Sequence, residues 1–330
     1  NGDTRVLYIW DHNLSSGPAP MPYNYGTEFN AADINSGNAT AHVDNSNGHG
    51  THVTGIAAGY GSALNAHKGV APAADIISVC VNWNLSDNNW LTTVADAVNY
   101  IYSKAAALNR PCVINISAGT YYGSLDVANF SQMKFAVGAD LVAPVFENLV
   151  MGTYYTVSQN TGIIRTDTLY GPSGNRIARI QRFASLANGR YSMIFNILPD
   201  STQYRYRLST AQIGKFDLWS FQMTPASALP TAQQFAEIVN YIAPDFNQTI
   251  VSSFSCSDKV ITVGEHKNRM TYTDCTNNLF TSTTNYTPGS LAPQSSHGPT
   301  RDNRLKPEIC ASGGMSLAAG AYNILPNLPA

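Results

Sequence analysis

The stretch at residues 47–55, Asn-Gly-His-Gly-Thr-His-Val-Thr-Gly, contains a side chain well placed for proton transfer, His49. Glycine on both sides of His49 lets other groups approach its imidazole closely, which an exposed proton-transfer group needs and a core histidine does not. Val53 and Ile56 recur at helical spacing, so we expect a glycine-flanked turn that opens a helix. His52 lies about one helical turn further along and is predicted to be structural.

An aspartate, Asp11, directly follows the short apolar run Val6–Trp10, which predicts a buried strand. Open α/β sheets place functional groups at the carboxyl ends of their strands, so Asp11 is a candidate catalytic carboxylate. A turn or capping aspartate would give the same pattern. The residues alone leave both interpretations open.

Residues 49–55, His-Gly-Thr-His-Val-Thr-Gly, resemble the histidine motif of the subtilases, His-Gly-Thr-His-Val-x-Gly, whose first histidine is the general base. In that family the catalytic aspartate follows the first core strand, and Asp11 matches this position. The flanking sequence Asp-His-Asn departs from the family's usual Asp-Thr-Gly or Asp-Ser-Gly. The resemblance implies that Asp11 orients His49, which takes the proton from a serine.

Segments further along the chain also resemble subtilase segments. Gly69–Pro72, Gly-Val-Ala-Pro, precedes the apolar run Asp75–Cys80, a predicted buried strand. Ser295–Thr300 reads Ser-Ser-His-Gly-Pro-Thr, and Leu305–Ile309 reads Leu-Lys-Pro-Glu-Ile. Asp258–Gly264 is similar to a subtilase core strand. The resemblance therefore covers most of the chain outside residues 151–246.

Cys112–Ile116 is predicted to form another central strand, and small residues follow it at Ser117, Ala118 and Gly119. Small side chains leave room for an incoming peptide to pair with the exposed edge of a sheet. The resemblance implies that these three residues line the first specificity pocket. The run Gly119–Gly123, Gly-Thr-Tyr-Tyr-Gly, is similar to one in the Csp-type subtilases.

The segment Leu141–Asn148 matches a subtilase strand that ends in Ala-Gly-Asn. The resemblance implies that Asn148 donates its side-chain amide to the oxyanion formed during acyl transfer. Glu147 stands where the family has glycine, and Pro144 interrupts the run. An asparagine that merely ends a strand is the alternative.

The sequence offers two locations for the nucleophilic serine of the predicted triad. Gly314–Gly320, Gly-Met-Ser-Leu-Ala-Ala-Gly, is similar to the family's Gly-Thr-Ser-Met-Ala-x-Pro and would make Ser316 the nucleophile. However, this segment follows the Lys-Pro-Glu segment at once, and Pro326 and Pro329 interrupt the helix that the serine should begin. We therefore expect the nucleophile beyond residue 330. In that case Ser316 should lie far from His49, on a surface segment. The alternative is that Ser316 is the nucleophile.

The alternation of predicted strands and helices indicates a doubly wound, mostly parallel α/β sheet of subtilisin type. From residue 151 the sequence pattern changes to short segments in which polar and apolar residues nearly alternate. These segments indicate an inserted antiparallel β-sandwich, which the resemblance implies is jelly-roll-like. The predicted organisation is residues 1–150 for the first part of the α/β domain, 151–246 for the insertion, and 247–330 for the continued, apparently truncated α/β domain. The strands of the insertion are predicted at Arg176–Phe183, Tyr191–Ile197 and Tyr204–Leu208.

Composition limits the class of partner. Charged residues make up 12% of the chain, the net charge is −2, and no basic run occurs, so nucleic acid is an unlikely partner. No run approaches the roughly 20 apolar residues of a membrane span. The five cysteines show no metal-binding spacing, and neither a metal nor a cofactor is predicted. Abundant hydroxyl and amide side chains favour a secreted or cell-surface location.

The predicted function is hydrolysis of peptide bonds by a subtilisin-like serine endopeptidase with an Asp-His-Ser triad, of which Asp11 and His49 are in this chain and Asn148 is the oxyanion donor. The expected partners are a peptide or protein substrate and a propeptide, which subtilases usually carry. The alternative is a catalytically inactive relative that keeps the fold and binds a peptide or protein.

Overall fold

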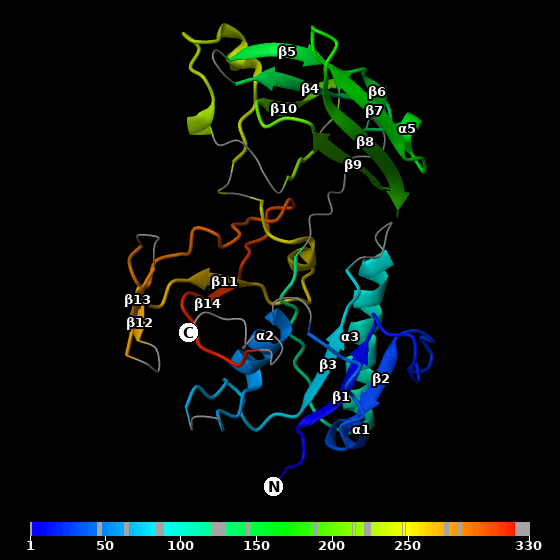
Figure 1. Ribbon diagram of the computed structural model, residues 1–330, viewed down its shortest axis with the longest axis vertical. Helices are drawn as coiled ribbons and strands as arrows, with labels where there is room; N and C mark the ends of the chain where they lie inside the picture. The colour runs from blue at the N-terminus through cyan, green and yellow to red at the C-terminus, as the bar shows by residue number, and fades with distance from the viewer. Residues whose placement is uncertain are drawn as a thin grey trace. The chain divides into compact units, whose positions relative to one another are not determined.

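The computed structural model divides the chain into two compact units, described separately below (Figure 1). Unit 1 consists of Asn1–Ala118, Lys267–Ser290 and Gly313–Ala330, and unit 2 of Gly119–His266 and Leu291–Ser312. Only the backbone is described at residues 89–91, 148–149, 187, 190 and 226. The structure describes residues 2–320 except 45–47, 63–65, 84–88, 120–129, 143–145, 188–189, 213, 215, 221–225, 246, 248, 274–276 and 283–285.

Unit 1 contains a three-stranded sheet in the order β2-β1-β3, with bounds Thr27–Asn30, Val6–Asp11 and Ile76–Cys80. The central strand β1 pairs with β3 in parallel and with β2 antiparallel. The apolar runs predicted the strands β1 and β3, and both are confirmed. In the parallel pair the last residues of the two strands, Asp11 and Cys80, lie opposite one another.

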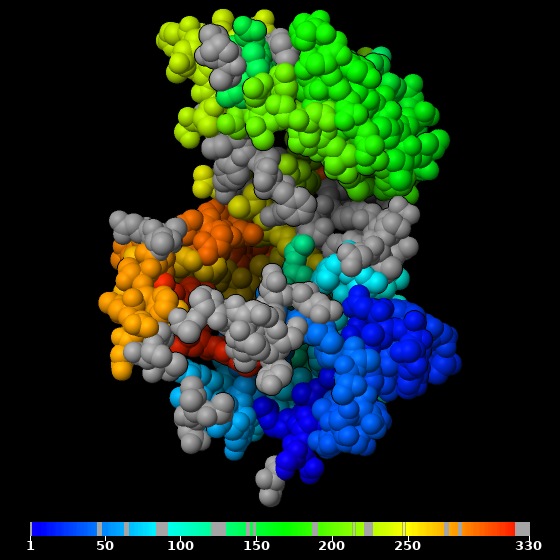
Figure 2. Space-filling model, in the orientation of Figure 1, coloured from blue at the N-terminus to red at the C-terminus, as the bar shows by residue number. Residues whose placement is uncertain are grey.

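The described residues of unit 1 include three helices: α1 (Ala31–Asn35), α2 (His49–Ala58) and α3 (Asn89–Ala107). α2 begins at His49, as the sequence predicts, because Gly48 adopts a left-handed φ of 70° that turns the chain into the helix. α3 runs alongside the sheet (Figure 1), and its buried side chains include Val94, Ala97 and Tyr100. A two-stranded hairpin, β12 (Thr271–Thr273) and β13 (Leu279–Thr281), lies at the surface of unit 1 (Figure 2).

Aromatic packing joins α3 to the sheet. Trp10 of β1 is fully buried, and its ring lies 4.8 Å from that of Tyr100 in α3. The Tyr100 hydroxyl donates to Glu28 on β2 at 2.6 Å, and Lys104 forms an ion pair with the same carboxylate at 2.8 Å. The core of unit 1 therefore lies directly beneath the strand that ends in Asp11.

Unit 2 is built mainly from two antiparallel sheets. One has the order β10-β4-β5, with β6 also pairing β4, and the other has the order β7-β8-β9. Buried side chains from both sheets, among them Ala139 of β4 and Ile177 of β8, form a common apolar cluster. The strands are β4 (Lys134–Leu141), β5 (Glu147–Met151), β6 (Tyr155–Thr156), β7 (Arg165–Tyr170), β8 (Arg176–Ala187), β9 (Arg190–Pro199) and β10 (Tyr204–Ala211).

The remaining elements of unit 2 are short. α5 (Val157–Asn160) follows β6, and three 3₁₀ turns lie at Ala226–Ala228, Ala236–Asn240 and Ser253–Cys256. β11 (Val263–His266) and β14 (Ile309–Ser312) form a parallel pair. The strand expected at Asp258–Gly264 therefore begins later, at Val263.

Two predicted strands are wrong. Cys112–Ile116 forms no strand, and Val113 is 97% exposed. Leu141–Asn148 is not one strand either, because β4 ends at Leu141 and β5 returns antiparallel to it. An apolar run shows that side chains need burial but does not identify the strand that would pair with them. A doubly wound parallel sheet is accordingly not confirmed within the described part of the chain.

Candidate functional site

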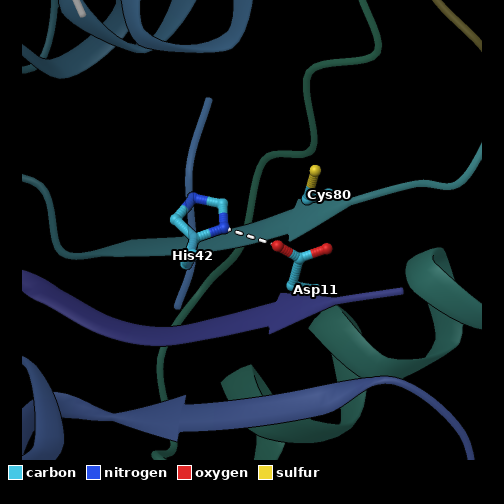
Figure 3. A group of neighbouring side chains, drawn as sticks. All are labelled: Asp11, His42 and Cys80. Atoms are coloured by element: carbon cyan, nitrogen blue, oxygen red, sulfur yellow. Dashed lines mark hydrogen bonds and ion pairs between the residues drawn. The ribbon is translucent and has the colours of Figure 1, made fainter. Parts of the chain in front are cut away.

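A cluster of three side chains of different chemistry lies where the parallel strands of unit 1 end (Figure 3). Asp11 ends β1 and Cys80 ends β3, and the backbone N–H of His12 donates to the carbonyl of Cys80 at 3.0 Å. His42, from the segment before α2, directs its ring at Asp11. The carboxyl ends of parallel strands meet at one edge, which is where open α/β sheets place functional groups.

The Asp11 carboxylate is almost fully buried, and N–H donors hold both of its oxygens. Oδ1 accepts from the backbone N–H and the side-chain amide of Asn13 at 2.9 and 3.0 Å, and Oδ2 lies 2.8 Å from Nδ1 of His42. Burial acts to raise the pKa of Asp11, but the hydrogen bonds from His42 and Asn13 outweigh it and lower the pKa. Asp11 is therefore an ionised carboxylate at neutral pH, as the orienting member of a triad must be.

The two residues after Asp11 explain the departure from the family's usual sequence. His12 is buried edge-on against the ring of Trp10, with ring centroids 4.1 Å apart, and burial lowers its pKa to about 4. His12 is thus a neutral packing residue. Asn13 supplies the two donors to Oδ1 of the carboxylate, and its side-chain nitrogen also lies 3.5 Å from the sulfur of Cys80. The sequence Asp-His-Asn is compatible with a functional Asp11.

Cys80 is a protonated thiol at neutral pH. Burial, with the nearby charges of Asp11 and Asp44, raises its pKa to about 11. The thiolate is the reactive form of cysteine, so Cys80 is a poor nucleophile in this environment.

His49 is exposed at the first residue of α2. Asp44 supports this end of the helix, because its carboxylate accepts from the backbone N–H and hydroxyl of Thr51 at 2.9 and 2.8 Å. Among the described residues, the N–H groups that reach Asp11 come from Asn13 and His42, and none comes from His49. The structure thus pairs the predicted catalytic aspartate with a different histidine.

The segment after Ser316 packs against α2. A Cβ added to Gly55 would lie 2.8 Å from the backbone nitrogen of Ala319 and 3.1 Å from its Cβ, so only glycine permits this approach. Gly55 is six residues beyond His49, or roughly 9 Å along the helix axis. Ser316 is half-buried, and residues 313–320 contain no helix. The expectation of a remote surface segment is therefore corrected, because this segment contacts the helix that His49 begins.

The predicted substrate-binding residues lie in an irregular segment. Ser117 and Gly119 are exposed, and the Ser117 hydroxyl accepts a hydrogen bond from the Asn115 amide at 2.9 Å. None of residues 112–118 forms a backbone–backbone hydrogen bond with another described residue. Ser117 and Ala118 belong to unit 1, whereas Gly119 belongs to unit 2.

Asn148, the predicted oxyanion donor, is the second residue of β5 in unit 2 and lies opposite Asp140 in the ladder with β4. It is thus inside an antiparallel pair and does not end a parallel strand. Only its backbone is described.

Sequence reasoning missed His42 and Cys80. The signal for Cys80 was present, because a residue that ends a predicted strand parallel to the first would share the edge of Asp11. No signal distinguished His42, which lies in a polar stretch without periodicity.

The described helices include none long and apolar enough to cross a membrane.

Comparison with known proteins confirms the resemblance inferred from the histidine motif. Residues 9–162, which include Asp11 and His49, match the family model described as the Subtilase family. The chain is 35% identical over 98 residues to a subtilisin of Bacillus sp. (strain TA39), a match covering 29% of this chain and 23% of the relative. It is 29% identical over 143 residues to thermitase of Thermoactinomyces vulgaris, covering 41% of this chain and 49% of the relative. The chain thus spans about half or less of the length of these relatives.

A solved structure, that of the Clostridium perfringens CspB protease, matches 97% of this chain and 73% of that chain. The TM-score is 0.48 and the sequence identity 16%. A match at this level does not by itself define a common fold. The subtilase match implies an α/β fold.

Proposed function

We propose that this chain is a serine endopeptidase of the subtilase type in which Asp11, His49 and Ser316 form the triad. Asp11 would orient His49, and His49 would accept the proton of the Ser316 hydroxyl as it attacks a peptide carbonyl. Serine is a weak nucleophile unless such a base lies within hydrogen-bond reach. The expected location is outside the cell or at its surface.

The contact of Ala318 and Ala319 with Gly55 carries this proposal. Two segments more than two hundred residues apart in the sequence, one resembling the histidine motif and one resembling the serine motif, lie against each other in unit 1. This packing supports Ser316 as the nucleophile over a serine outside the 330 residues.

The bond between Asp11 and His42 is part of the same proposal. His42 precedes α2 and His49 is its first residue, and the Asp11 carboxylate has one oxygen, Oδ2, that takes an imidazole donor. We therefore infer that the arrangement with His42 on Asp11 is a resting state. In the active state His49 would take the place of His42.

The substrate would bind along residues 112–118, whose backbone groups are unpaired within the described part of the chain. An extended peptide satisfies such groups by adding as a strand, while the small side chains of Ser117 and Ala118 leave room for its side chains. The roles of Gly119 in this pocket and of Asn148 at the oxyanion rest on the resemblance alone.

Fluorophosphonate labelling of the full chain tests the proposal. We expect one equivalent of probe on wild type and none on Ser316→Ala, because the probe reacts with an activated serine. Ser312→Ala, four residues earlier and exposed, is the matched control and should label like wild type. Labelling that survives Ser316→Ala, or wild type that takes no probe, would contradict the assignment of Ser316.

The second candidate function is a catalytically silent relative that binds a peptide or protein. The hydrogen bond of Asp11 to His42 favours it, because a histidine without its carboxylate partner is a poor general base. This candidate predicts peptide binding at residues 112–118 with no probe labelling of any variant.

A further inference from the structure

We propose that Asp11, His42 and Cys80 form a binding site for a borderline-soft divalent cation of the Zn²⁺ type. The three side chains offer a carboxylate oxygen, an imidazole nitrogen and a sulfur, and these atoms all lie within 4.8 Å of one another (Figure 3). No such site is predicted from the cysteine spacing, because the ligands come from three separate segments of the chain.

The sheet fixes two of the three ligands. Asp11 and Cys80 are the paired last residues of β1 and β3, and Trp10 anchors β1 in the core immediately before Asp11. Backbone pairing therefore places the two side chains next to each other on the sheet before any cation binds. A preformed pair of ligands lowers the conformational cost of binding.

Tetrahedral coordination requires only small movements of the three side chains, whose ligand atoms lie within 4.8 Å of one another. Zinc bonds of about 2.0–2.2 Å to nitrogen and oxygen, and about 2.3 Å to sulfur, place neighbouring ligand atoms roughly 3.3–3.7 Å apart. Asp11 Oδ2 and His42 Nδ1 are 2.8 Å apart, so this pair must open by less than about 1 Å. A small shift of His42 supplies this opening, since His42 lies in a loop and is half-buried.

The donor set selects the class of cation. Thiolate and imidazole ligands suit Zn²⁺ and its neighbours, whereas Mg²⁺ and Ca²⁺ prefer all-oxygen sites. Three protein ligands leave a fourth position for water, as in catalytic zinc sites. Binding by sulfur takes the thiolate, so the Cys80 proton passes to solvent.

Asn13 completes the arrangement behind the ligands. Its backbone and side-chain N–H groups donate to Oδ1 of Asp11, which leaves Oδ2 to face His42. Such outer hydrogen bonds orient a ligand and typically change metal affinity about 10–100-fold when removed. Asn13→Ala should weaken binding by this factor.

If the proposed function holds, a cation bound at this site should inhibit the enzyme. A cation on Asp11 takes the carboxylate that His49 needs, so the cation would inhibit peptide hydrolysis by holding the resting arrangement. Binding itself does not depend on catalysis. The test below is therefore read by spectroscopy as well as by activity.

Titration of the reduced full chain with Co²⁺, a spectroscopic stand-in for Zn²⁺, tests the site. We expect one equivalent to bind with a thiolate-to-cobalt charge-transfer band, and Zn²⁺ to displace it. The band should be lost in Cys80→Ser, and binding should weaken at least about 10-fold in His42→Ala. Cys112→Ser and His67→Ala are matched controls that keep the band, since both residues lie in unit 1 outside the cluster.

Circular dichroism of each variant verifies folding, and the loop position of His42 makes His42→Ala the variant least disruptive to the sheet. A band that persists in Cys80→Ser, a band lost in Cys112→Ser, or wild type that binds no cobalt would overturn the site. Cobalt binding without inhibition in an active chain would leave the metal site standing and contradict the role of Asp11 in catalysis. Cobalt binding by a chain that hydrolyses no peptide would support the metal site and contradict the proposed function.

Discussion

Replacing His49 with alanine is expected to lower kcat/KM for a peptide substrate by about 10⁴–10⁶-fold, the loss typical of removing a member of a catalytic triad. His42→Ala should change kcat/KM by less than about 10-fold in either direction, because His42 takes no part in the reaction and its removal frees Oδ2 of Asp11. The physical basis is that only the histidine that takes the serine proton contributes to the transition state. Hydrolysis of a fluorogenic peptide by chelator-treated protein measures both values.

The two variants control for each other, because each removes one imidazole, His42 just before α2 and His49 at its first residue. A large loss in His42→Ala with little loss in His49→Ala would make His42 the base and invalidate the alignment with the histidine motif. Equal, small losses in both would contradict a catalytic role for either histidine. Wild type that hydrolyses no peptide would favour a protein that binds peptides without cleaving them.

Trp10→Ala is expected to lower the free energy of unfolding by about 3–5 kcal/mol, the usual cost of truncating a buried tryptophan. Trp10 is fully buried, its ring lies 4.8 Å from those of Tyr23 and Tyr100, and its indole N–H donates to the Tyr25 carbonyl at 3.0 Å. The substitution leaves a cavity beneath the strand that ends in Asp11. Urea unfolding followed by circular dichroism measures the change.

Two further variants control for this result. Trp10→Phe should cost less, because an aromatic ring still fills most of the space. Trp83→Ala removes a tryptophan that is 49% exposed and should change stability by less than about 1 kcal/mol. If Trp83→Ala destabilised the chain as much as Trp10→Ala, the core of unit 1 would lie elsewhere.

Local patterns predicted the elements nearest the site. The apolar runs before Asp11 and Cys80 became β1 and β3, and the glycine before His49 adopted the left-handed conformation that starts α2. These signals are local, because periodicity and glycine conformation depend on neighbours in the sequence.

Such local patterns do not identify which strand pairs with which. The run Cys112–Ile116 is as apolar as β3 but has no ladder, and the run ending in Asn148 folds back on β4. The partner of Asp11 could not be derived either, because two histidines in one connecting segment are equivalent until the tertiary structure places one of them. The choice of His42 depends on how the loop before α2 crosses the ends of the strands.

A crystal structure of the full chain after reaction with a fluorophosphonate inhibitor tests the central claim most directly. The account predicts phosphorus bonded to the Ser316 hydroxyl oxygen, and Nδ1 of His49 within about 2.6–3.2 Å of an Asp11 carboxylate oxygen, with His42 displaced. An unmodified Ser316, or an inhibited chain in which Asp11 remains bonded to His42, would contradict it.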